Sequence, residues 1–493
     1  MRGIQPVRFL AALAVVALTA AACEGADVTE NGEAPDDPID DADVDDDAAD
    51  DDPDAEAATD EEIEEQLDEE EVPEDATAVT IAAVNNPQMQ DMNELADRFN
   101  DEQDEVFVQF VILPEEQLRD RVTQDVATEA GQFDIVTIGN YEAPIWAANG
   151  WLTNLSEFYE GDDEYDHEDF IEPVRDTLSH EGDLHAVPFY GESSFLMYQE
   201  EIFEEEGIEM PERPTWDEVA DIARELHDPD ENFYGICLRG AAGWGANLAP
   251  LNTVVNTFGG IWYDMDWNAQ LDQPEFIEAV QFYVDLLDDA GQPDPASDSF
   301  TECLPLFAGG DVAMWYDATS AVTTVEDPDA SDVAGNVGYA YAPVRDTDAA
   351  GWLWAWAMAI PASSDNQEAA WEFVRWSTSK DYHRLVGEEI GWERTPPGAR
   401  ESTYDIPEYQ EVSEAYGDIY LDSMLEVDAE NPGVEETPYI GIQWIGIPEF
   451  QDLGTDVSQE IADAIAGNQS VEDAMEEGQR LAEQVAEQGG YRD

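Results

Sequence analysis

The residues of this sequence best suited to specific chemistry are tryptophans, one arginine and one aspartate. Trp315, Trp354 and Trp356, three of 14 tryptophans, offer flat apolar faces on which the C–H groups of a ligand can stack. Arg239 is one of only 17 basic residues, and its planar guanidinium can donate paired hydrogen bonds to neighbouring oxygens. Asp317 ends the segment that carries Trp315 and adds an acceptor. Such a set suits a small hydroxyl-rich molecule, which needs polar partners around an aromatic wall.

Each of these residues also has a purely structural interpretation. Trp352, Trp354 and Trp356 alternate, which is typical of one face of a strand, and such a face can pack in a core. Arg239 follows an apolar run and could form a structural ion pair. Asp317 could be the N-cap of a helix. The sequence alone leaves both interpretations open.

The elements that must position these residues begin near residue 77. Short β-branched apolar runs with the length of buried strands occur at 77–84, 106–113 and 133–138. A helical pattern covers 89–99, and another follows the second run. Alternating strands and helices predict an α/β fold with a parallel sheet, in which ligands bind at the carboxyl ends of the strands. Four residues follow such ends and are either ligand candidates or ordinary turn residues: Asn85, Asn86, Asn140 and Tyr141.

A second group of elements is predicted further along the chain. Residues 189–194 are typical of a crossing between two sheets, and a strand is predicted at 195–198. Thr215 is a good N-cap residue, and Glu218 stands three residues later, where it can complete a capping box. This spacing predicts a helix that extends through Leu226.

The sequence also resembles a known family. Pro188-x-x-x-Glu192, an apolar strand ending in Tyr198 and a Thr-Trp-Asp-Glu helix start follow one another as in the extracellular solute-binding proteins of bacterial ABC sugar importers, the group that contains maltose-binding protein. Later segments resemble the sorbitol/mannitol branch of this group. These segments are 234–240, 256–260, 313–319, 352–361, 396–400 and 439–443. The resemblance covers nearly everything after residue 77, although the group's pattern includes neither so acidic a surface nor an acidic tether.

The resemblance implies a periplasmic-binding-protein fold, in which two discontinuous α/β lobes close on a ligand in a hinge cleft. The first lobe is expected to combine 77–188 with 350–395, and the second 189–349 with 396–493. The implied function is that of a non-enzymatic, monomeric receptor without a cofactor, which captures a polyol (sorbitol or mannitol) or a related sugar and delivers it to ABC permease subunits. A receptor for a different mono- or oligosaccharide is the alternative.

The same resemblance implies a role for Glu192 as a ligand carboxylate. In so acidic a chain, a solvated surface acid is the alternative interpretation of Glu192. Arg239 could pair with Glu192 or with Asp317 instead of a ligand. Trp244 lies in a glycine-flanked loop and is a weaker stacking candidate.

Two other classes of protein are alternatives to a receptor. A secreted glycoside hydrolase needs two carboxylates at catalytic separation, but a chain with 119 Asp and Glu always offers such a pair, so this pattern is uninformative. A surface scaffold predicts internal repeats, and the sequence has none. The receptor interpretation is therefore favoured.

The charge of the chain excludes several kinds of partner. The formal net charge is −102, and there is no cluster of Lys and Arg for nucleic acid or anionic lipid. Lys380 is the sole lysine. At high ionic strength the Debye length falls to about 3 Å near 1 M salt, so crowded carboxylates no longer repel one another strongly. We therefore expect a halophilic, salt-adapted protein that is unstable in low salt, with an ordinary acidic protein as the alternative.

The N-terminus predicts export. Arg2 and Arg8 precede an apolar run, 9–22, that is too short for a membrane span of about 20 residues, so residues 1–22 are interpreted as a signal peptide. Cys23 directly follows three alanines and resembles a bacterial lipobox, although Ala20 stands where leucine is usual. Lipidation of Cys23 would anchor the protein outside the cytoplasm; plain cleavage nearby is the alternative. Residues 23–76 are expected to form an acidic disordered tether.

The remaining cysteines and a calcium-like pattern leave further questions. Cys237 and Cys303 could form a disulfide or remain two buried thiols. Acidic or amide residues occupy five places of a calcium-loop template, but Ala269 replaces the required glycine. These five are Asp264, Asp266, Asn268, Asp272 and Glu275. The last two are better explained as a capping box for a helix at 276–287, and no metal site is expected.

Overall fold

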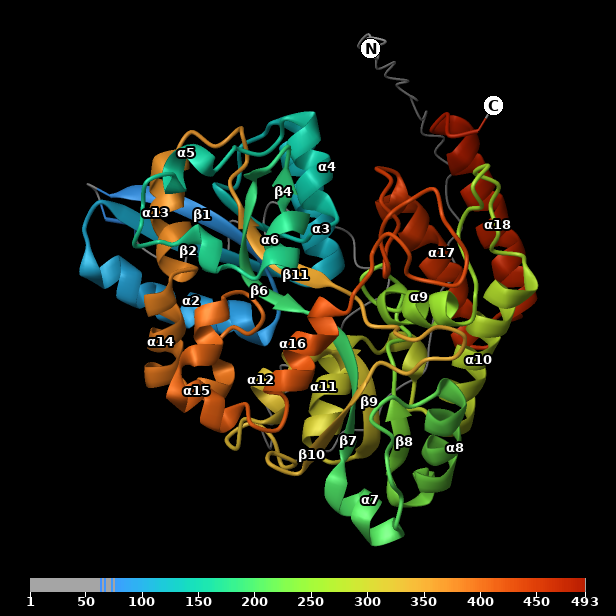
Figure 1. Ribbon diagram of the computed structural model, residues 1–493. Coiled ribbons are helices and arrows are strands. Elements are labelled where there is room, and N and C mark those ends of the chain that lie inside the picture. Colours follow the sequence, from blue (N-terminus) through green and yellow to red (C-terminus); the bar gives the residue numbers. More distant parts are fainter. Residues whose placement is uncertain (1–62, 64–65, 68–71, 74–75, 493) are drawn as a thin grey trace, which may run out of the picture. The chain divides into compact units, whose positions relative to one another are not determined.

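The computed structural model describes residues 63, 66–67, 72–73 and 76–492, all of which belong to one unit spanning Asp51–Asp493 (Figure 1). The predicted signal peptide, Cys23 and most of the predicted tether lie outside these residues. No helix of the described part is long and apolar enough to cross a membrane.

Five strands form the first sheet. In spatial order they are β2 (Val106–Leu113), β1 (Thr77–Val84), β3 (Ile135–Ile138), β11 (Trp354–Ala359) and β6 (Ala186–Glu192). β1 pairs in parallel with both β2 and β3, as predicted from their apolar, β-branched runs. β11 is antiparallel to both β3 and β6, so the sheet is mixed rather than purely parallel. The α/β fold class is confirmed. The expected parallel sheet is confirmed for β1, β2 and β3, but the pairing of β11 shows that it does not hold for the whole sheet.

The second sheet has four strands and is largely antiparallel. In spatial order they are β10 (Val337–Tyr341), β7 (Ser194–Gln199), β9 (Val312–Ala318) and β8 (Tyr234–Cys237). β9 is buried over its whole length, because helices cover the sheet and its strand residues are almost all apolar. A separate pair of two-residue strands is formed by β4 (Ser179–His180) and β5 (Asp183–Leu184).

One residue separates the two sheets at the chain's first crossing between them, and the chain crosses back between β10 and β11. β6 ends at Glu192 and β7 begins at Ser194, so Ser193 alone lies between strands of different sheets (Figure 1). Ser193 is fully buried. Its carbonyl accepts a hydrogen bond from the Thr319 N–H at 2.9 Å, and its own N–H donates to Thr319 Oγ1 at 3.0 Å. The crossing is thus fixed against the end of β9.

Helices surround both sheets. The α-helices between the first strand and the middle of the chain are α2 (Pro87–Glu102), α3 (Glu115–Thr128), α4 (Glu142–Asn149), α5 (Ser156–Tyr159), α6 (Glu172–Thr177), α7 (Glu200–Glu206), α8 (Trp216–Leu226) and α9 (Leu248–Thr257). Those that follow are α10 (Pro274–Ala290), α11 (Phe300–Ala308), α12 (Val322–Val325), α13 (Gln367–Ser377), α14 (Lys380–Glu389), α15 (Pro407–Val412), α16 (Gly417–Leu425), α17 (Phe450–Ile465) and α18 (Val471–Gln488).

The predicted helix starts have different outcomes. The capping box of α8 is formed as predicted, because Thr215 accepts from the Glu218 N–H and the Glu218 carboxylate accepts from the Thr215 N–H. α10 is present, but its N-cap is Gln273 without a side-chain bond. The expected capping box from Asp272 to Glu275 was therefore wrong. Pro274 at the first helical position instead fixes the backbone for the first turn.

The lobe boundaries remain a prediction. Each sheet draws its strands from the segments expected for one lobe, except that β6 extends past residue 188 to the crossing. Arg400, beyond the predicted boundary at 395, donates to the carbonyls of Tyr165 and Thr378 at 3.1 and 2.7 Å. Its segment therefore contacts elements of the predicted first lobe.

Candidate ligand-binding site

A small cavity of about 60 Å³ lies where the crossing, β11 and the loop after β8 meet. Four tryptophans form much of its wall. They are Trp244, Trp352, Trp354 and Trp356. Its other lining residues are Glu115, Arg119, Tyr190, Glu192, Arg239, Gly245, Ala249, Phe300, Ala318, Ser320 and Gln443.

β11 places its tryptophans beside the polar end of β6. Trp354 is opposite Glu192 in the sheet register, and Trp356 is opposite Tyr190. The ring centroids of Trp354 and Trp356 are 5.7 Å apart, so the two side chains share one face of the strand. Gly139 makes room for Trp354, since a Cβ at that position would lie 2.0 Å from the indole ring. The alternation of Trp and Ala in β11 thus turns the indoles toward the cavity.

Arg239 lines the cavity and is already paired with an acid. Its Nε donates to Asp317 Oδ2 at 2.9 Å, its Nη2 donates to Asp317 Oδ1, and its Nη1 donates to the Gly245 carbonyl at 2.8 Å. Burial alone lowers the pKa of Arg239, but the Asp317 carboxylate raises it above its ordinary value. The guanidinium therefore stays charged and rigid at the cavity wall.

Glu192 is a buried carboxyl, not a surface acid. The Ser320 hydroxyl donates to its Oε2, and the residue is 6% exposed. Burial raises the pKa of Glu192 to about 7, although the Ser320 bond and the Arg239 charge lower it. Near neutral pH this group can therefore act both as donor and as acceptor toward a hydroxyl.

This burial predicts a pH effect on stability. Between about pH 4.5 and pH 7 the native state binds more protons at Glu192 than the unfolded state, so stability falls as pH rises through this window. The loss is on the order of 3 kcal/mol. We expect Glu192→Gln to remove this part of the pH dependence. Urea unfolding of both proteins from pH 4.5 to 8 checks this, and parallel curves for the two proteins would contradict it.

Arg119 is a cavity residue that the sequence analysis missed. It is 6% exposed on α3 and is bound by Glu115 Oε1, at 3.1 Å from Nε and 2.7 Å from Nη2, and by Glu142. Its Cζ lies 4.1 Å from the centroid of the Trp244 ring and 5.1 Å from that of Trp354. Arginine is scarce in this chain, and this signal, which singled out Arg239, could have singled out Arg119 too.

The residues predicted at the strand ends lie close to the cavity wall but do not line the cavity. Asn86 Oδ1 accepts from the Met89 N–H at 2.9 Å as the N-cap of α2, and its Nδ2 donates to the Tyr190 hydroxyl at 3.0 Å. Asn140 Nδ2 donates to the Leu353 carbonyl at 3.0 Å. Both amides thus hold cavity-bearing segments in place.

Trp315 and Asp317 lie behind the cavity wall. Both are fully buried, and neither is among the lining residues. The Trp315 ring packs against Phe300 at 5.4 Å and Phe307 at 6.0 Å, and its Nε1 donates to Asp317 Oδ2 at 3.1 Å. Asp317 is no helix N-cap, since it belongs to β9. These two residues support Arg239, and a contact of either with ligand stays a prediction.

Tyr141 connects α4 to the segment before α17. Its hydroxyl donates to the Ile447 carbonyl at 3.1 Å and accepts from the Gln451 N–H at 3.2 Å. Its ring lies 5.2 Å from that of Trp244, which lines the cavity. α4 follows a strand of the first sheet, whereas α17 packs on α10 beside the second. Tyr141 therefore connects a helix next to the first sheet with a helix next to the second, beside the Trp244 wall of the cavity.

We expect Tyr141→Phe to raise the Kd of a cavity ligand by about five- to tenfold, because it removes two hydrogen bonds that hold the halves together. Isothermal titration calorimetry measures the Kd, and stopped-flow fluorescence is expected to show faster release. Tyr341→Phe is the control, since Tyr341 lies outside the cavity lining. Equal Kd values for both variants and the parent would contradict the prediction.

A second, wider groove has a volume of about 440 Å³ but offers a less specific wall. It contains no tryptophan, and its charged residues are mostly acids on loops. Its one arginine, Arg213, is bound by Glu426 at 2.6 Å. We therefore place the candidate site in the smaller, tryptophan-lined cavity.

The calcium-like pattern has a local structural explanation. The Asp264 carboxylate accepts from the backbone N–H groups of Asp266 and Asn268 at 2.9 Å each and also from the Asn268 amide. It therefore stabilises a turn. Within the described part of the chain, no group of three or more His, Cys, Asp or Glu residues could hold a metal ion.

Proteins similar to this chain are found by sequence and by structure. A family model described as bacterial extracellular solute-binding protein matches residues 83–384. A mannitol-binding protein of Pseudomonas aeruginosa is 41% identical over 419 residues, which is 85% of this chain and 95% of that protein. An erythritol/L-threitol-binding protein of Mycolicibacterium smegmatis is 26% identical over 62% of this chain and 67% of its own length.

A solved structure of a similar protein also contains mannitol. The crystal structure of an ABC transporter solute-binding protein from Agrobacterium vitis with bound D-mannitol is 45% identical, with a TM-score of 0.82. The similarity covers 84% of this chain and 99% of that one. The shared fold therefore includes both sheets of the described unit.

Proposed function

The chain belongs to the family of bacterial extracellular solute-binding proteins, and on this basis we propose that its tryptophan-lined cavity binds a linear polyol, with mannitol as the first candidate. Members of this family are non-enzymatic components of ABC transporters. The observation that carries the proposal is the cavity itself, which combines indoles in edge-to-face contact with a buried carboxyl that can both donate and accept hydrogen bonds.

A polyol matches this wall in chemistry. Each hydroxyl donates one hydrogen bond and accepts up to two, and the carbon chain that carries the hydroxyls presents C–H groups. Trp354 and Trp356 offer faces for the C–H groups, while Glu192, Arg119 and Gln443 offer polar atoms. Gln443 Oε1 is buried without a hydrogen-bond partner among the described residues, so a ligand hydroxyl could satisfy it. The two relatives at above 40% identity are named for, or hold, mannitol.

Elements of both sheets contribute residues to the cavity, so a bound ligand can change the arrangement of the protein. Cavity residues come from β6 and β11 of the first sheet and from the loop after β8, α11 and the end of β9 on the side of the second. A ligand that contacts both sides favours the closed arrangement and shifts the population toward it. The transporter can then distinguish loaded from empty receptor.

The proposal is tested by thermal unfolding of the full chain in high salt with a panel of polyols, monosaccharides and disaccharides. A ligand that binds only the native state raises the midpoint. We expect mannitol to give the largest shift. A shift with disaccharides alone would keep the receptor function but contradict the polyol assignment, and no shift with any of these compounds would contradict both.

We further propose that the protein works outside the cytoplasm as a monomeric lipoprotein held by Cys23, with permease subunits as its partners. The signal-like N-terminus and the family support this proposal. The net charge of −102 supports adaptation to high salt. Labelling with a radioactive fatty acid, compared between the parent chain and Cys23→Ser, tests the anchor.

A further inference from the structure

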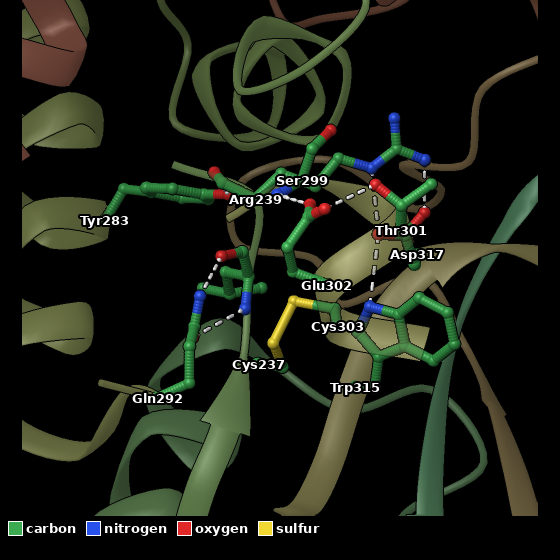
Figure 2. Close-up of a disulfide and its surroundings, with 11 residues drawn as sticks. Cys237, Arg239, Tyr283, Gln292, Ser299, Thr301, Glu302, Cys303, Trp315 and Asp317 are labelled. Atoms are coloured by element: carbon green, nitrogen blue, oxygen red, sulfur yellow. Dashed lines mark hydrogen bonds and ion pairs between the residues drawn. A yellow bond between two sulfur atoms is a disulfide. The ribbon is translucent and has the colours of Figure 1, made fainter. Parts of the chain in front are cut away.

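A disulfide lies directly behind one wall of the cavity. Cys237 ends β8 and Cys303 lies on α11; their sulfur atoms are bonded, with 5.8 Å between the Cα atoms (Figure 2). Arg239 stands two residues after Cys237, and Phe300 stands three residues before Cys303, nearly one turn of α11. Both Arg239 and Phe300 line the cavity. The disulfide therefore joins the two segments that supply this wall.

The positions of Arg239 and Phe300 depend on each other. The Arg239 Cζ atom lies 5.3 Å from the centroid of the Phe300 ring. Phe300 also packs on Trp315, whose Nε1 donates to the same Asp317 carboxylate that binds Arg239. A shift of the first turn of α11 would thus disturb both the ring and the partner of the guanidinium.

The backbone of the Arg239 segment is held by hydrogen bonds from neighbouring side chains and from one backbone carbonyl (Figure 2). The Tyr283 hydroxyl donates to the Arg239 carbonyl at 2.7 Å. The Gln292 amide donates to the Leu238 carbonyl at 2.8 Å and accepts from the Leu238 N–H at 3.3 Å. The Asp298 carbonyl, just before α11, accepts from the backbone of Gly240 and Ala241 at 2.8 and 2.9 Å. These bonds fix the segment's backbone, and the disulfide adds a covalent link to α11 itself.

We propose that the Cys237–Cys303 disulfide positions Arg239 and Phe300 for the ligand and thereby sets the affinity of the site, beyond its contribution to stability. This inference rests on the proposed function, because it concerns the same cavity. Dithiothreitol tests it chemically. The dithiol loses two electrons and two protons to the Sγ–Sγ bond, which leaves two protein thiols and the oxidised cyclic disulfide of the reagent.

The experiment compares mannitol binding to the full chain before and after reduction, and to the variant Cys237→Ser/Cys303→Ser. We expect the Kd to rise about tenfold when the disulfide is absent, because ligand binding must then also order the segments that carry Arg239 and Phe300. Circular dichroism establishes that each sample is folded. Thr215→Ala is the control, since it weakens the α8 cap at a residue outside the cavity lining and is expected to lower the unfolding midpoint without changing the Kd.

The possible outcomes separate the two proposals. An unchanged Kd in a folded, reduced protein would overturn the positioning role and leave the disulfide a purely stabilising bond. Absence of mannitol binding to the oxidised parent chain would instead overturn the proposed function. If the serine pair does not fold, Cys237→Ala/Cys303→Val keeps an apolar contact at the same place, and the same increase in Kd is expected.

Discussion

Replacing Trp354 by alanine is expected to weaken mannitol binding by about 100-fold. Loss of a central aromatic anchor typically costs about 2–4 kcal/mol, and 2.7 kcal/mol corresponds to this factor. Trp354 is 6% exposed, lines the cavity, and fills the space that Gly139 leaves open. Calorimetric titration with mannitol measures the change.

Two further variants make this prediction specific. Trp354→Phe keeps an aromatic face and is expected to recover part of the affinity. Trp267→Ala removes an indole that stacks on Tyr491 outside the cavity lining, so it is expected to leave the Kd unchanged. Equal losses for Trp354→Ala and Trp267→Ala would show that the effect is general destabilisation rather than loss of a ligand contact.

Replacing Arg239 by leucine is expected to reduce the free energy of unfolding by about 3–5 kcal/mol, because it leaves the Asp317 carboxylate buried without its partner. Asp317 is 0% exposed, so water cannot solvate the remaining charge. Urea unfolding followed by tryptophan fluorescence measures the loss. Binding of mannitol is expected to be lost as well, since Arg239 forms part of the wall.

The double variant Arg239→Leu/Asp317→Leu separates these two effects. It removes the unpaired charge and is expected to recover part of the stability, because an apolar pair can replace a buried ion pair. Recovery is incomplete, since the Trp315 Nε1–H and the Ala318 N–H lose the carboxylate that accepts from them. Mannitol binding is expected to remain lost. A double variant as unstable as the single one would contradict this account.

The local features of the fold were predictable from the sequence. β1 and β2 have the predicted bounds, because β-branched apolar runs flanked by polar turns carry a strong local signal. The mixed direction of the first sheet was not predictable in this way. β11 enters it from more than 200 residues further along the chain, and no local pattern specifies the neighbour or the direction of a strand. The family resemblance, which the comparisons confirm, supplied the two-lobe expectation instead.

The site was predictable where a residue type was unusual in its context. Arg239 is such a residue and lines the cavity, and the alternation in β11 correctly pointed to Trp354 and Trp356 as one face. Glu192 also lines the cavity, but it was the family resemblance that singled it out. Gln443 ends the segment 439–443, which resembles the sorbitol/mannitol branch, but it was not predicted as a site residue, because only tertiary structure brings this irregular segment to the wall. That any of these residues contacts a ligand remains a prediction.

The single-residue crossing at Ser193 can act as a pivot between the two sheets. A rotation of one sheet about this point moves each atom in proportion to its distance from it. The bond between Ser320 and Glu192 lies beside the crossing, because Glu192 precedes Ser193 and Ser320 follows the Thr319 that binds it. Glu192, next to the crossing, would therefore move little in such a rotation, and a ligand hydroxyl bound to it would keep that bond.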